Sequence, residues 1–325
     1  MTVHISEAEV REVLNMALAV EAVEEISRKQ ATGEVVVHPR RRFELPGGGF
    51  FHYMAAADYA AGFVAMKQYT YVHGKLCFLV PLYEMATGGL LALIEADYMG
   101  QLRTGAASGV ATKYLARKDA RVAAIIGTGG QARTQLEAVA AVRKLESARA
   151  YGRDAIKREK FCKEMSERLG VSVVPCASAG EAVRGADIVS TATTTSQPVV
   201  SGVDLAPGCH INAIGANHAH KRELDDEAVA SADVIVVDSV EQSRQEAGDL
   251  IIAFHGDEIC WTGVKKLCEV VSGKTSGRTS DTEVTLFKSN GIASWDLAVA
   301  MKVYAMAREK KLGTELPLWA GAPEA

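Results

Sequence analysis

The sequence predicts an α/β protein with a Rossmann-type doubly wound parallel sheet and a second, mixed α+β domain. Between about residues 122 and 240, short apolar runs alternate with helix-like stretches, which is the pattern of repeated βα units. These runs are continuously apolar, as in strands that are covered on both faces. Residues 1 to about 120 contain runs that alternate polar and apolar residues or are joined by Gly-rich turns. That pattern favours an antiparallel or mixed sheet.

The first domain is expected to begin with a helix from Glu7 to about Gln30 and to continue with strands. The strand-like runs are EVVVHPRRRFEL, GGFFHYMA, GFVAMKQYTYV and LCFLVPLYEMATGGLLALIEAD. A long helix, YMGQLRTGAASGVATKYLARKD, leads out of this domain, and a closing helix, SWDLAVAMKVYAMAREKK, is expected to pack back on it. We therefore predict one domain over residues 1–120, completed by 294–325, and a second over residues 121–293.

The second domain is expected to hold the parallel sheet. Its predicted strands are VAAIIG, SARAYG, VSVVPC, DIVSTAT, CHINAIG and DVIVVDS. The stretch from HGDEICW to SGKTSGRTSD is rich in Gly, Ser and Thr, so it is expected to be a loop.

Composition limits the partners of the protein. The 325 residues are 48% hydrophobic and 23% charged, with a formal net charge of −4 and dispersed basic residues, so no nucleic-acid partner is expected. The N-terminus is charged and no apolar run approaches the roughly 18 residues of a membrane span, which predicts a cytoplasmic protein without a membrane partner. The six cysteines form no C-x-x-C pair and are expected to be reduced. No metal site is expected, because His218 and His220 lack a further ligand pattern.

The segment VAAIIGTGGQARTQ predicts a dinucleotide site. Gly127, Gly129 and Ala132 have G-x-G-x-x-A spacing, directly after an apolar strand and before a helix. The first glycine permits a tight turn, the second lets the backbone approach a pyrophosphate, and the alanine allows close packing of helix on strand. The N–H groups that begin the helix, at Gly130 and Gln131, are expected to hold the anion.

The end of the next strand, ARAYGRD, bears on the choice of dinucleotide. An acidic residue there would bind the ribose hydroxyl of NAD, whereas an arginine accommodates the extra phosphate of NADP. Arg153 precedes Asp154, and Asp154 is also a candidate helix N-cap. NADP is therefore the predicted cofactor, with NAD as the alternative.

The chain resembles the ornithine cyclodeaminase/mu-crystallin family over nearly its whole length. The matching segments are HPRRR, MKQYTY, EMATGGLLALIEADYMGQLRTGAASGVATKYLA, IIGTGGQARTQLEA, AIGANHAHKRELD and FKSNGIASWDLAVA. The family includes cyclodeaminases, alanine dehydrogenases, ketimine and imine reductases, and crystallins that bind thyroid hormone. The resemblance implies that the first domain binds substrate and forms a homodimer, and that the second binds NAD(P).

By the same resemblance, three cations surround the substrate, and they match Arg41, Lys67 and Arg103. Each lies in an apolar or small-residue context, where an unpaired charge costs several kcal/mol. A substrate α-carboxylate would supply the missing anion, with arginine as a bidentate partner and lysine as a point charge. The alternative is an internal salt bridge. Its candidate carboxylates are Glu84, Glu95 and Asp97.

The resemblance also implies the remaining cofactor contacts. Arg103 and Thr104, in the segment LRTG, are expected to reach the cofactor phosphate. Three segments with small residues near strand ends are expected to lie against the nicotinamide, and they contain Thr193, Ala216 and Gly291.

Asn217 decides between reactions within the family. Cyclodeaminases have an aspartate at this position, which handles protons on the substrate amine, whereas asparagine has no titratable group and can only orient an amine or water. Reduction of an imine needs a positioned hydride and a protonated nitrogen, and Lys67 is the candidate proton donor. We therefore predict an NAD(P)H-dependent oxidoreductase that reduces the C=N bond of a small α-imino acid to an L-amino acid. A cyclodeaminase-type lyase using catalytic NAD and a non-enzymatic binding protein are the alternatives.

Overall fold

The structure is a computed structural model that describes residues 1–318. Its contacts divide the chain into two units, residues 1–103 with 292 onward, and residues 104–291. The division falls inside helix α3 (Asp97–Leu115), whereas the sequence predicted it after residue 120. The predicted completion of the first domain by residues 294–325 extends, beyond residue 318, outside the described part of the chain.

The first unit is a mixed sheet with helices on one face. Its seven strands have the order β15-β1-β6-β5-β4-β3-β2, and the pair β1 with β6 is parallel while its other pairs are antiparallel. The strands are β1 (Thr2–Ile5), β2 (Val35–Glu44), β3 (Phe50–Asp58), β4 (Phe63–Val72), β5 (Lys75–Glu84), β6 (Leu90–Glu95) and β15 (Thr314–Leu316). The predicted mixed α+β architecture is confirmed.

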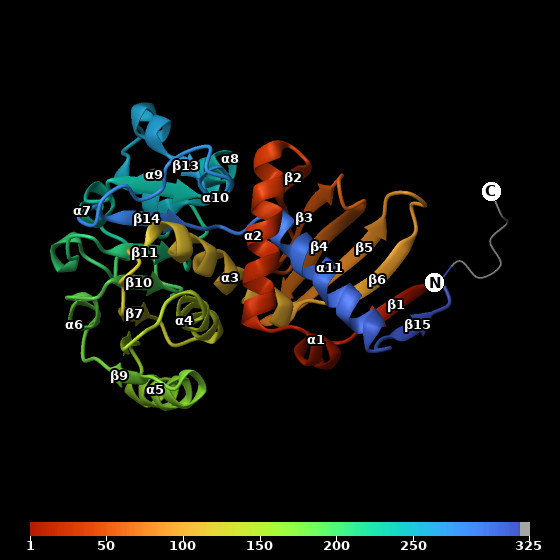
Figure 1. Ribbon diagram of the computed structural model, residues 1–325, viewed down its shortest axis with the longest axis horizontal. Helices are drawn as coiled ribbons and strands as arrows, with labels where there is room; N and C mark the ends of the chain where they lie inside the picture. The colour runs from red at the N-terminus through yellow and green to blue at the C-terminus, as the bar shows by residue number, and fades with distance from the viewer. Residues whose placement is uncertain (319–325) are drawn as a thin grey trace. The chain divides into compact units, whose positions relative to one another are not determined.

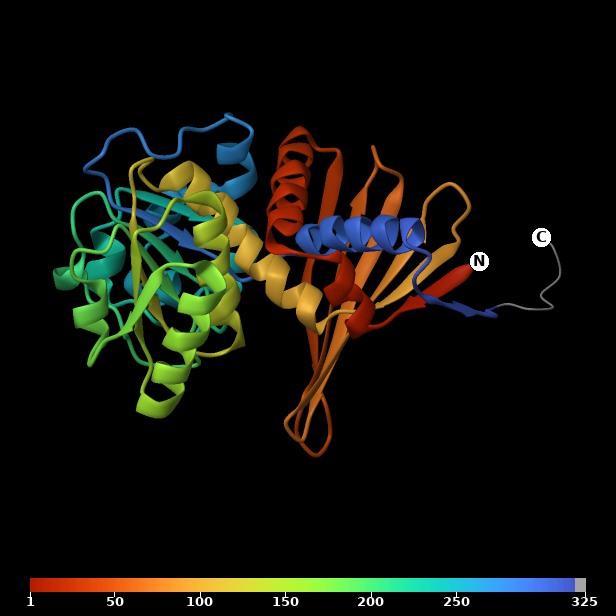
Figure 2. The same cartoon turned by 60° about the horizontal axis from the view of Figure 1, so that its bottom comes forward.

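The helices of this unit are α1 (Glu7–Val13), α2 (Met16–Thr32), α11 (Ala293–Glu309) and the first residues of α3. The predicted single helix at the N-terminus is divided, because Asn15 caps α2 by accepting a hydrogen bond from Leu18 N at 3.0 Å. Figure 2 shows α2 and α11 on the same side of the sheet. Alternate residues of β3, β4 and β6 are buried, as expected for strands covered on one face.

The second unit is a parallel sheet of eight strands with the order β13-β12-β14-β11-β10-β7-β8-β9. Its strands are β7 (Val122–Ile126), β8 (Ser147–Tyr151), β9 (Ser172–Pro175), β10 (Ile188–Thr191), β11 (His210–Ala213), β12 (Val234–Val237), β13 (Lys265–Lys266) and β14 (Thr285–Lys288). The chain runs from β7 to β8 and β9 on one side and then returns to β10 on the other. Ligands bind at such a reversal in open α/β sheets.

Helices cover both faces of this sheet, and each face has its own hydrophobic core. The helices are α4 (Gly130–Val142), α5 (Ala155–Leu169), α6 (Ala179–Val183), α7 (Asp226–Ala230), α8 (Val240–Glu246), α9 (Gly248–Ala253) and α10 (Leu267–Val271). One core contains side chains of α4 and α5, and the other contains side chains of α6, α7 and α9. Figure 1 shows these two sets on opposite sides of the strands. The predicted Rossmann-type doubly wound sheet is confirmed.

One prediction for this unit was wrong. The stretch expected to be a loop, residues 255–281, contains the 3-10 helix Glu258–Gly263, the short strand β13 and helix α10. These elements are only two to six residues long, and the buried Trp261 and Leu267 anchor them in a polar sequence. Short elements of this kind have too few residues to produce a periodic pattern.

Candidate functional site

Lys67 is a buried cation on the helix-covered face of the first unit. It lies on β4 opposite Met54 of β3, and only 4% of its surface is exposed. Helix α3 passes close to the ammonium group, since a Cβ at Gly100 would lie 2.8 Å from Lys67 Nζ. A residue without a side chain at position 100 therefore leaves room for this amine.

One carboxylate joins the two buried cations of this unit. Lys67 Nζ and Arg103 Nε both donate to Asp296 Oδ1, each at 3.0 Å. Arg103 comes from α3, and Asp296 comes from the first turn of α11. Among the described residues, Asp296 Oδ2 has no hydrogen-bond partner although the side chain is only 1% exposed. Three elements far apart in the sequence thus converge on one carboxylate.

The pKa of Lys67 is lowered to about 8. Burial is the main cause, because it disfavours the charged amine, and the charges of Arg103 and Arg40 lower the pKa further. Asp296 opposes them by its charge and its hydrogen bond. The pKa of the ammonium therefore lies near physiological pH, where a group can both give and take a proton.

The internal partner of Lys67 and Arg103 is none of the three carboxylates that the sequence suggested. Glu95, for example, pairs with His4 Nε2 at 3.3 Å instead. Asp296 is 229 residues from Lys67 in the chain, so neither cation's sequence neighbourhood could indicate it. What could have indicated Asp296 is its position as a lone acidic residue among the apolar residues of the closing helix.

The arginines of β2 differ in their direction. A bulge lies between His38 and Arg41, after which Arg41 pairs with Tyr53 and Arg42 pairs with His52. Cross-strand partners share a face, and His52 is on the Lys67 face, so Arg41 points to the opposite face and is exposed. Arg40 is half-buried and lowers the pKa of Lys67. The structure thus brings Arg40, rather than the predicted Arg41, to Lys67.

The dinucleotide loop of the second unit follows β7. Gly127 has a φ of +113°, and a Cβ there would lie 2.4 Å from the carbonyl oxygen of Ala192, just after β10. Gly129 is the N-cap of α4 and provides no side-chain cap, and a Cβ at this position would meet nothing within 4 Å. Gln131 Oε1, in the first turn, is buried without a hydrogen-bond partner in the described chain. An open, uncapped helix N-terminus fits a pyrophosphate.

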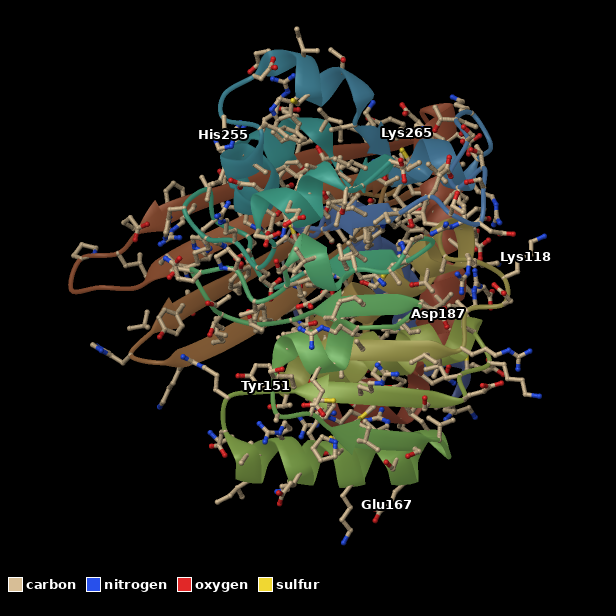
Figure 3. The ribbon with its side chains drawn as sticks, turned by 90° about the vertical axis from the view of Figure 1, so that its left-hand side faces the viewer. Lys118, Tyr151, Glu167, Asp187, His255 and Lys265 are labelled. Carbon is tan, nitrogen blue, oxygen red and sulfur yellow. The ribbon has the colours of Figure 1, made fainter. Side chains whose placement is uncertain are left out.

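The end of β8 carries Tyr151, Gly152, Arg153 and Asp154. Figure 3 labels Tyr151 at this end of the sheet and Asp187, which precedes β10, at the other. Asp154 is the N-cap of α5 and accepts a hydrogen bond from Lys157 N at 3.0 Å, which lowers its pKa. Arg153 is exposed. The only carboxylate of this segment is therefore engaged in capping.

Glu223 joins two of the strand ends expected to face the nicotinamide. The side chain is fully buried, and Oε1 accepts hydrogen bonds from Thr193 N at 2.6 Å and Thr193 Oγ1 at 2.7 Å. Its Oε2 accepts from Thr191 Oγ1 and Gly215 N, each at 2.7 Å. Burial raises the pKa of Glu223, and the charge of Lys288 and the hydrogen bonds from Thr191 and Thr193 act in the opposite direction. Nothing in the sequence pattern indicates this role, since Glu223 lies within a helix-start pattern.

A second carboxylate holds the third strand end. Asp238 Oδ2 accepts hydrogen bonds from Asn290 N at 2.7 Å and from Gly291 N at 2.6 Å. Gly291 has a φ of +84°, a conformation that favours glycine. The predicted contact residue Ala216 is 1% exposed, and its carbonyl oxygen accepts a hydrogen bond from the buried Lys288. Thr193, Ala216 and Gly291 are therefore fixed through their backbones by buried charged residues.

Asn217 and Thr104 have local partners in the second unit. The Asn217 Oδ1 atom lies 2.9 Å from His218 Nδ1 in a half-buried loop. The carbonyl oxygen of Thr104 accepts a hydrogen bond from Gln135 Nε2 at 3.2 Å, which ties α3 to α4. Asp225, which follows Asn217 by eight residues, caps α7 by accepting a hydrogen bond from Ala228 N at 2.7 Å.

Residues 1–318 contain neither a membrane-spanning helix nor a cluster of metal ligands. No helix there is both long enough and apolar enough to cross a membrane. No group of three or more His, Cys, Asp or Glu side chains there could hold a metal ion.

Known proteins match the chain along most of its length. The profile of the ornithine cyclodeaminase/mu-crystallin family matches residues 2–311. A Δ1-pyrroline-2-carboxylate reductase of Bacillus cereus is 41% identical over 243 residues, which are 73% of this chain and 73% of that protein.

Two solved structures share the fold closely. The Δ1-pyrroline-2-carboxylate reductase of Thermococcus litoralis, in complex with NADH and L-proline, has a TM-score of 0.92 and 37% identity, covering 97% of this chain and 100% of the other. An archaeal alanine dehydrogenase, a dimer with bound NAD, has a TM-score of 0.91 and 35% identity, covering 98% and 99%. These neighbours hold NAD(H).

Replacing Asp296 by Asn is expected to lower the pKa of Lys67 below its value of about 8, because the carboxylate is the group that raises it. The measurement is the pH dependence of the Lys67 Cε chemical shift in protein labelled with ¹³C-lysine, assigned with Lys67→Arg. Lys29, whose pKa Asp58 raises, is the control within the same unit. An unchanged Lys67 midpoint would show that the two groups are not coupled.

Proposed function

The chain belongs to the ornithine cyclodeaminase/mu-crystallin family, and within it we propose that the protein is an NAD(P)H-dependent oxidoreductase. Its proposed reaction is the reduction of the C=N bond of a small α-imino acid to an L-amino acid. The observation that carries this proposal is the buried group of Lys67, Arg103 and Asp296, with Arg40 close enough to act on it. Three cations near one carboxylate leave an excess of positive charge, which suits an anionic substrate.

The proposed roles follow from the chemistry of each group. Arg103 and Arg40 bind the substrate carboxylate, for which guanidinium geometry is suited. Lys67 donates a proton to the imine nitrogen, because an amine with a pKa of about 8 is mostly protonated at neutral pH and yet gives up its proton readily. Asp296 keeps both cations in position. When bound, the reduced nicotinamide supplies the hydride that adds to the carbon of the C=N bond.

Asn217 supports reduction over ring-closing deamination. A cyclodeaminase must move protons on the substrate amine through several steps, and asparagine cannot carry a proton. Asn217 is proposed to orient the substrate nitrogen or a water by hydrogen bonding. Imine reduction needs only one proton besides the hydride, and Lys67 can provide it.

The cofactor is proposed to bind at the N-terminus of α4. The N–H groups at Gly129, Gly130 and Gln131 would hold the pyrophosphate, with Arg103 and Thr104 near a phosphate. Thr193, Ala216 and Gly291 would present backbone to the nicotinamide, and the fixed strand ends described above support this. NADPH is proposed as the preferred form, because Asp154 is engaged as a helix cap and Arg153 is free to approach a 2′-phosphate. The two solved neighbours hold NAD(H), so NADH is the alternative.

A homodimer is proposed to form through the face of the first sheet opposite Lys67. Half-buried apolar side chains such as Val64 and Met66 point to this face, and Phe43, Phe51 and Tyr53 lie together on it. A patch of this kind on a soluble protein marks an interaction surface. The dimeric alanine dehydrogenase with the same fold supports the proposal.

The function is tested by mixing the purified protein with NADPH or NADH and a panel of substrates. The panel contains 2-oxo acids with ammonia or methylamine, and the cyclic imines pyrroline- and piperideine-2-carboxylate. Loss of reduced-cofactor absorbance with at least one of them is expected. Proline formation from ornithine with catalytic NAD, without any reduction on the panel, would instead establish a cyclodeaminase. Cofactor binding without turnover of the imine panel or of ornithine would indicate a binding protein.

Lys67→Ala is expected to lower kcat/KM for imine reduction by about 10²–10⁴, the range of a lost general acid, while dinucleotide affinity stays near wild type. In the wild type, kcat/KM is expected to fall as pH rises through about 8, because the lowered pKa of Lys67 means that the amine loses its proton there. Steady-state kinetics across the pH range and cofactor titration provide both readouts. A Lys67→Ala variant with wild-type kcat/KM would remove this residue from the mechanism.

Arg40→Ala and Arg41→Ala form a matched pair in one strand. Arg40→Ala is expected to raise KM for the imino acid by at least tenfold, because a charged hydrogen bond to a carboxylate is worth about 1.5–3 kcal/mol. Arg41→Ala is expected to leave KM within about threefold of wild type, because its side chain points to the other face. A larger increase in KM for Arg41→Ala than for Arg40→Ala would assign the substrate contact to Arg41, as the sequence predicted.

Arg153→Ala is expected to weaken NADPH binding by about tenfold and NADH binding by less than twofold, since only NADPH has the phosphate that the guanidinium would pair with. Lys157→Ala, on the exposed first turn of α5, is the control for a nearby positive charge. Fluorescence titration of each cofactor gives the two dissociation constants. Equal losses for the two cofactors would argue for a general electrostatic effect and against the proposed preference.

Sedimentation equilibrium is expected to give a molar mass about twice 34.6 kDa. Met66→Asp, which places a charge on the proposed dimer face, is expected to give a monomer because an unpaired charge is costly at an apolar interface. Ile156→Asp, at an 80% exposed position of α5, is the control and should remain dimeric. A monomeric wild type would refute the dimer, and a dimeric Met66→Asp would refute this face.

A further inference from the structure

A row of aromatic side chains continues from Lys67 along the same face of the first sheet. His52 pairs with Tyr69, and Tyr69 pairs with Phe78, so the three side chains share a face. Tyr69 is two residues after Lys67 on β4, and Phe50 is two residues before His52 on β3, which puts both on that face as well. We name His52, Tyr69, Phe78 and Phe50 the aromatic row.

The members of the aromatic row contact one another and begin at the amine. Lys67 Nζ lies 5.2 Å from the centre of the Phe78 ring. The ring centres are 4.8 Å apart for Tyr69 and Phe78, 4.9 Å for His52 and Tyr69, and 4.5 Å for Phe50 and His52. His52 Nδ1 and Tyr69 Oη are joined by a hydrogen bond of 2.5 Å. This bond fixes the orientation of the middle of the row, so the row is a preformed surface.

The face becomes exposed beyond the end of the row that lies away from Lys67. His52 is 6% exposed, the other members of the row are half-buried, and the next residues on this face, Tyr71 and Leu76, are 38% and 51% exposed. Figure 2 shows the β2–β3 and β4–β5 hairpins extending past α11. An apolar surface that continues from a reactive amine to solvent is typical of a ligand site.

The row also lacks net charge at its outer end. Arg42 stacks over the Phe50 ring at 4.5 Å, and its Nε atom pairs with Glu44 Oε1 at 2.6 Å. This ion pair is neutral overall, so neither an acidic nor a basic ligand group gains from it. A charged group laid on the rings would lose hydration with no opposite net charge beside it at this end of the row, whereas an apolar group would gain from burial.

We propose that the aromatic row is the subsite for the substrate's side chain and that it selects imino acids with an apolar ring, aromatic or branched aliphatic side chain over those with a charged one. The inference rests on the proposed function. An α-imino acid has its side chain on the same carbon as its carboxylate and its C=N bond. If Lys67 serves that nitrogen, the side chain lies within a few ångströms of Lys67, and Phe78 is the ring at that distance.

The experiment compares kcat/KM for four imines in wild type, Phe78→Ala, Phe78→Leu and Tyr69→Leu. The imines are piperideine-2-carboxylate and those formed from methylamine with phenylpyruvate, pyruvate and oxaloacetate. Tyr59→Leu is the control, because Tyr59 is a 61% exposed aromatic residue beyond the other end of β3. Thermal unfolding of each variant shows whether it is folded. If Phe78→Ala does not fold, the conservative variants Phe78→Leu and Tyr69→Leu still test the inference.

In the wild type, the cyclic and phenylpyruvate imines are expected to exceed the pyruvate imine at least tenfold and the oxaloacetate imine at least a hundredfold. The row variants should lose 10–200-fold on the two larger apolar imines, the range for altered apolar contacts, and less than threefold on the pyruvate imine. The control should keep the wild-type ranking. Equal losses on every imine, or a wild-type preference for oxaloacetate, would overturn the inference while leaving imine reduction intact. No reduction of any imine would overturn the proposed function itself.

Discussion

Burial of Lys67 is the constraint on which the first unit depends. A lone ammonium in an apolar layer costs several kcal/mol, so the fold must bring an anion to it. Asp296 is that anion, and it also holds Arg103. The contact requires β4, α3 and α11 to adopt one arrangement, because each contributes a single charged atom to it. The pKa of Lys67 near neutrality follows from the same balance of burial and charge.

The second unit uses buried carboxylates in a different way. Glu223 and Asp238 bind backbone N–H groups at the ends of parallel strands, where the chain leaves its ladder and those groups have no strand partner. Fixing loops through their backbones leaves the residues at positions 193, 216 and 291 free to be small. A flat ring can approach such a surface closely, which a wall of long side chains would prevent.

The sequence predicted the repeated strands and helices well, but it predicted poorly which side chains meet in the folded protein. The parallel strands from β7 to β12 could be predicted because most of them lie in short, mainly apolar runs, and the glycine loop could be predicted because its spacing is local. The family resemblance pointed to Arg41, but the structure brings Arg40 to Lys67, because a bulge in β2 that the sequence pattern does not indicate changes which residues face the helices. Asp296 and Glu223 were missed because their partners are distant in the chain or are backbone atoms.

Helix α11 gives the protein a particular order of events during its synthesis. The strand with Lys67 leaves the ribosome before helix α11, and the whole second unit lies between them in the sequence. Until α11 emerges, the amine lacks the carboxylate of Asp296 and the sheet face lacks the helix that covers it. The second unit is continuous in sequence and can fold meanwhile. The chain therefore cannot complete its charged centre before the second unit has been synthesised, which keeps a product truncated within that unit from carrying a finished site.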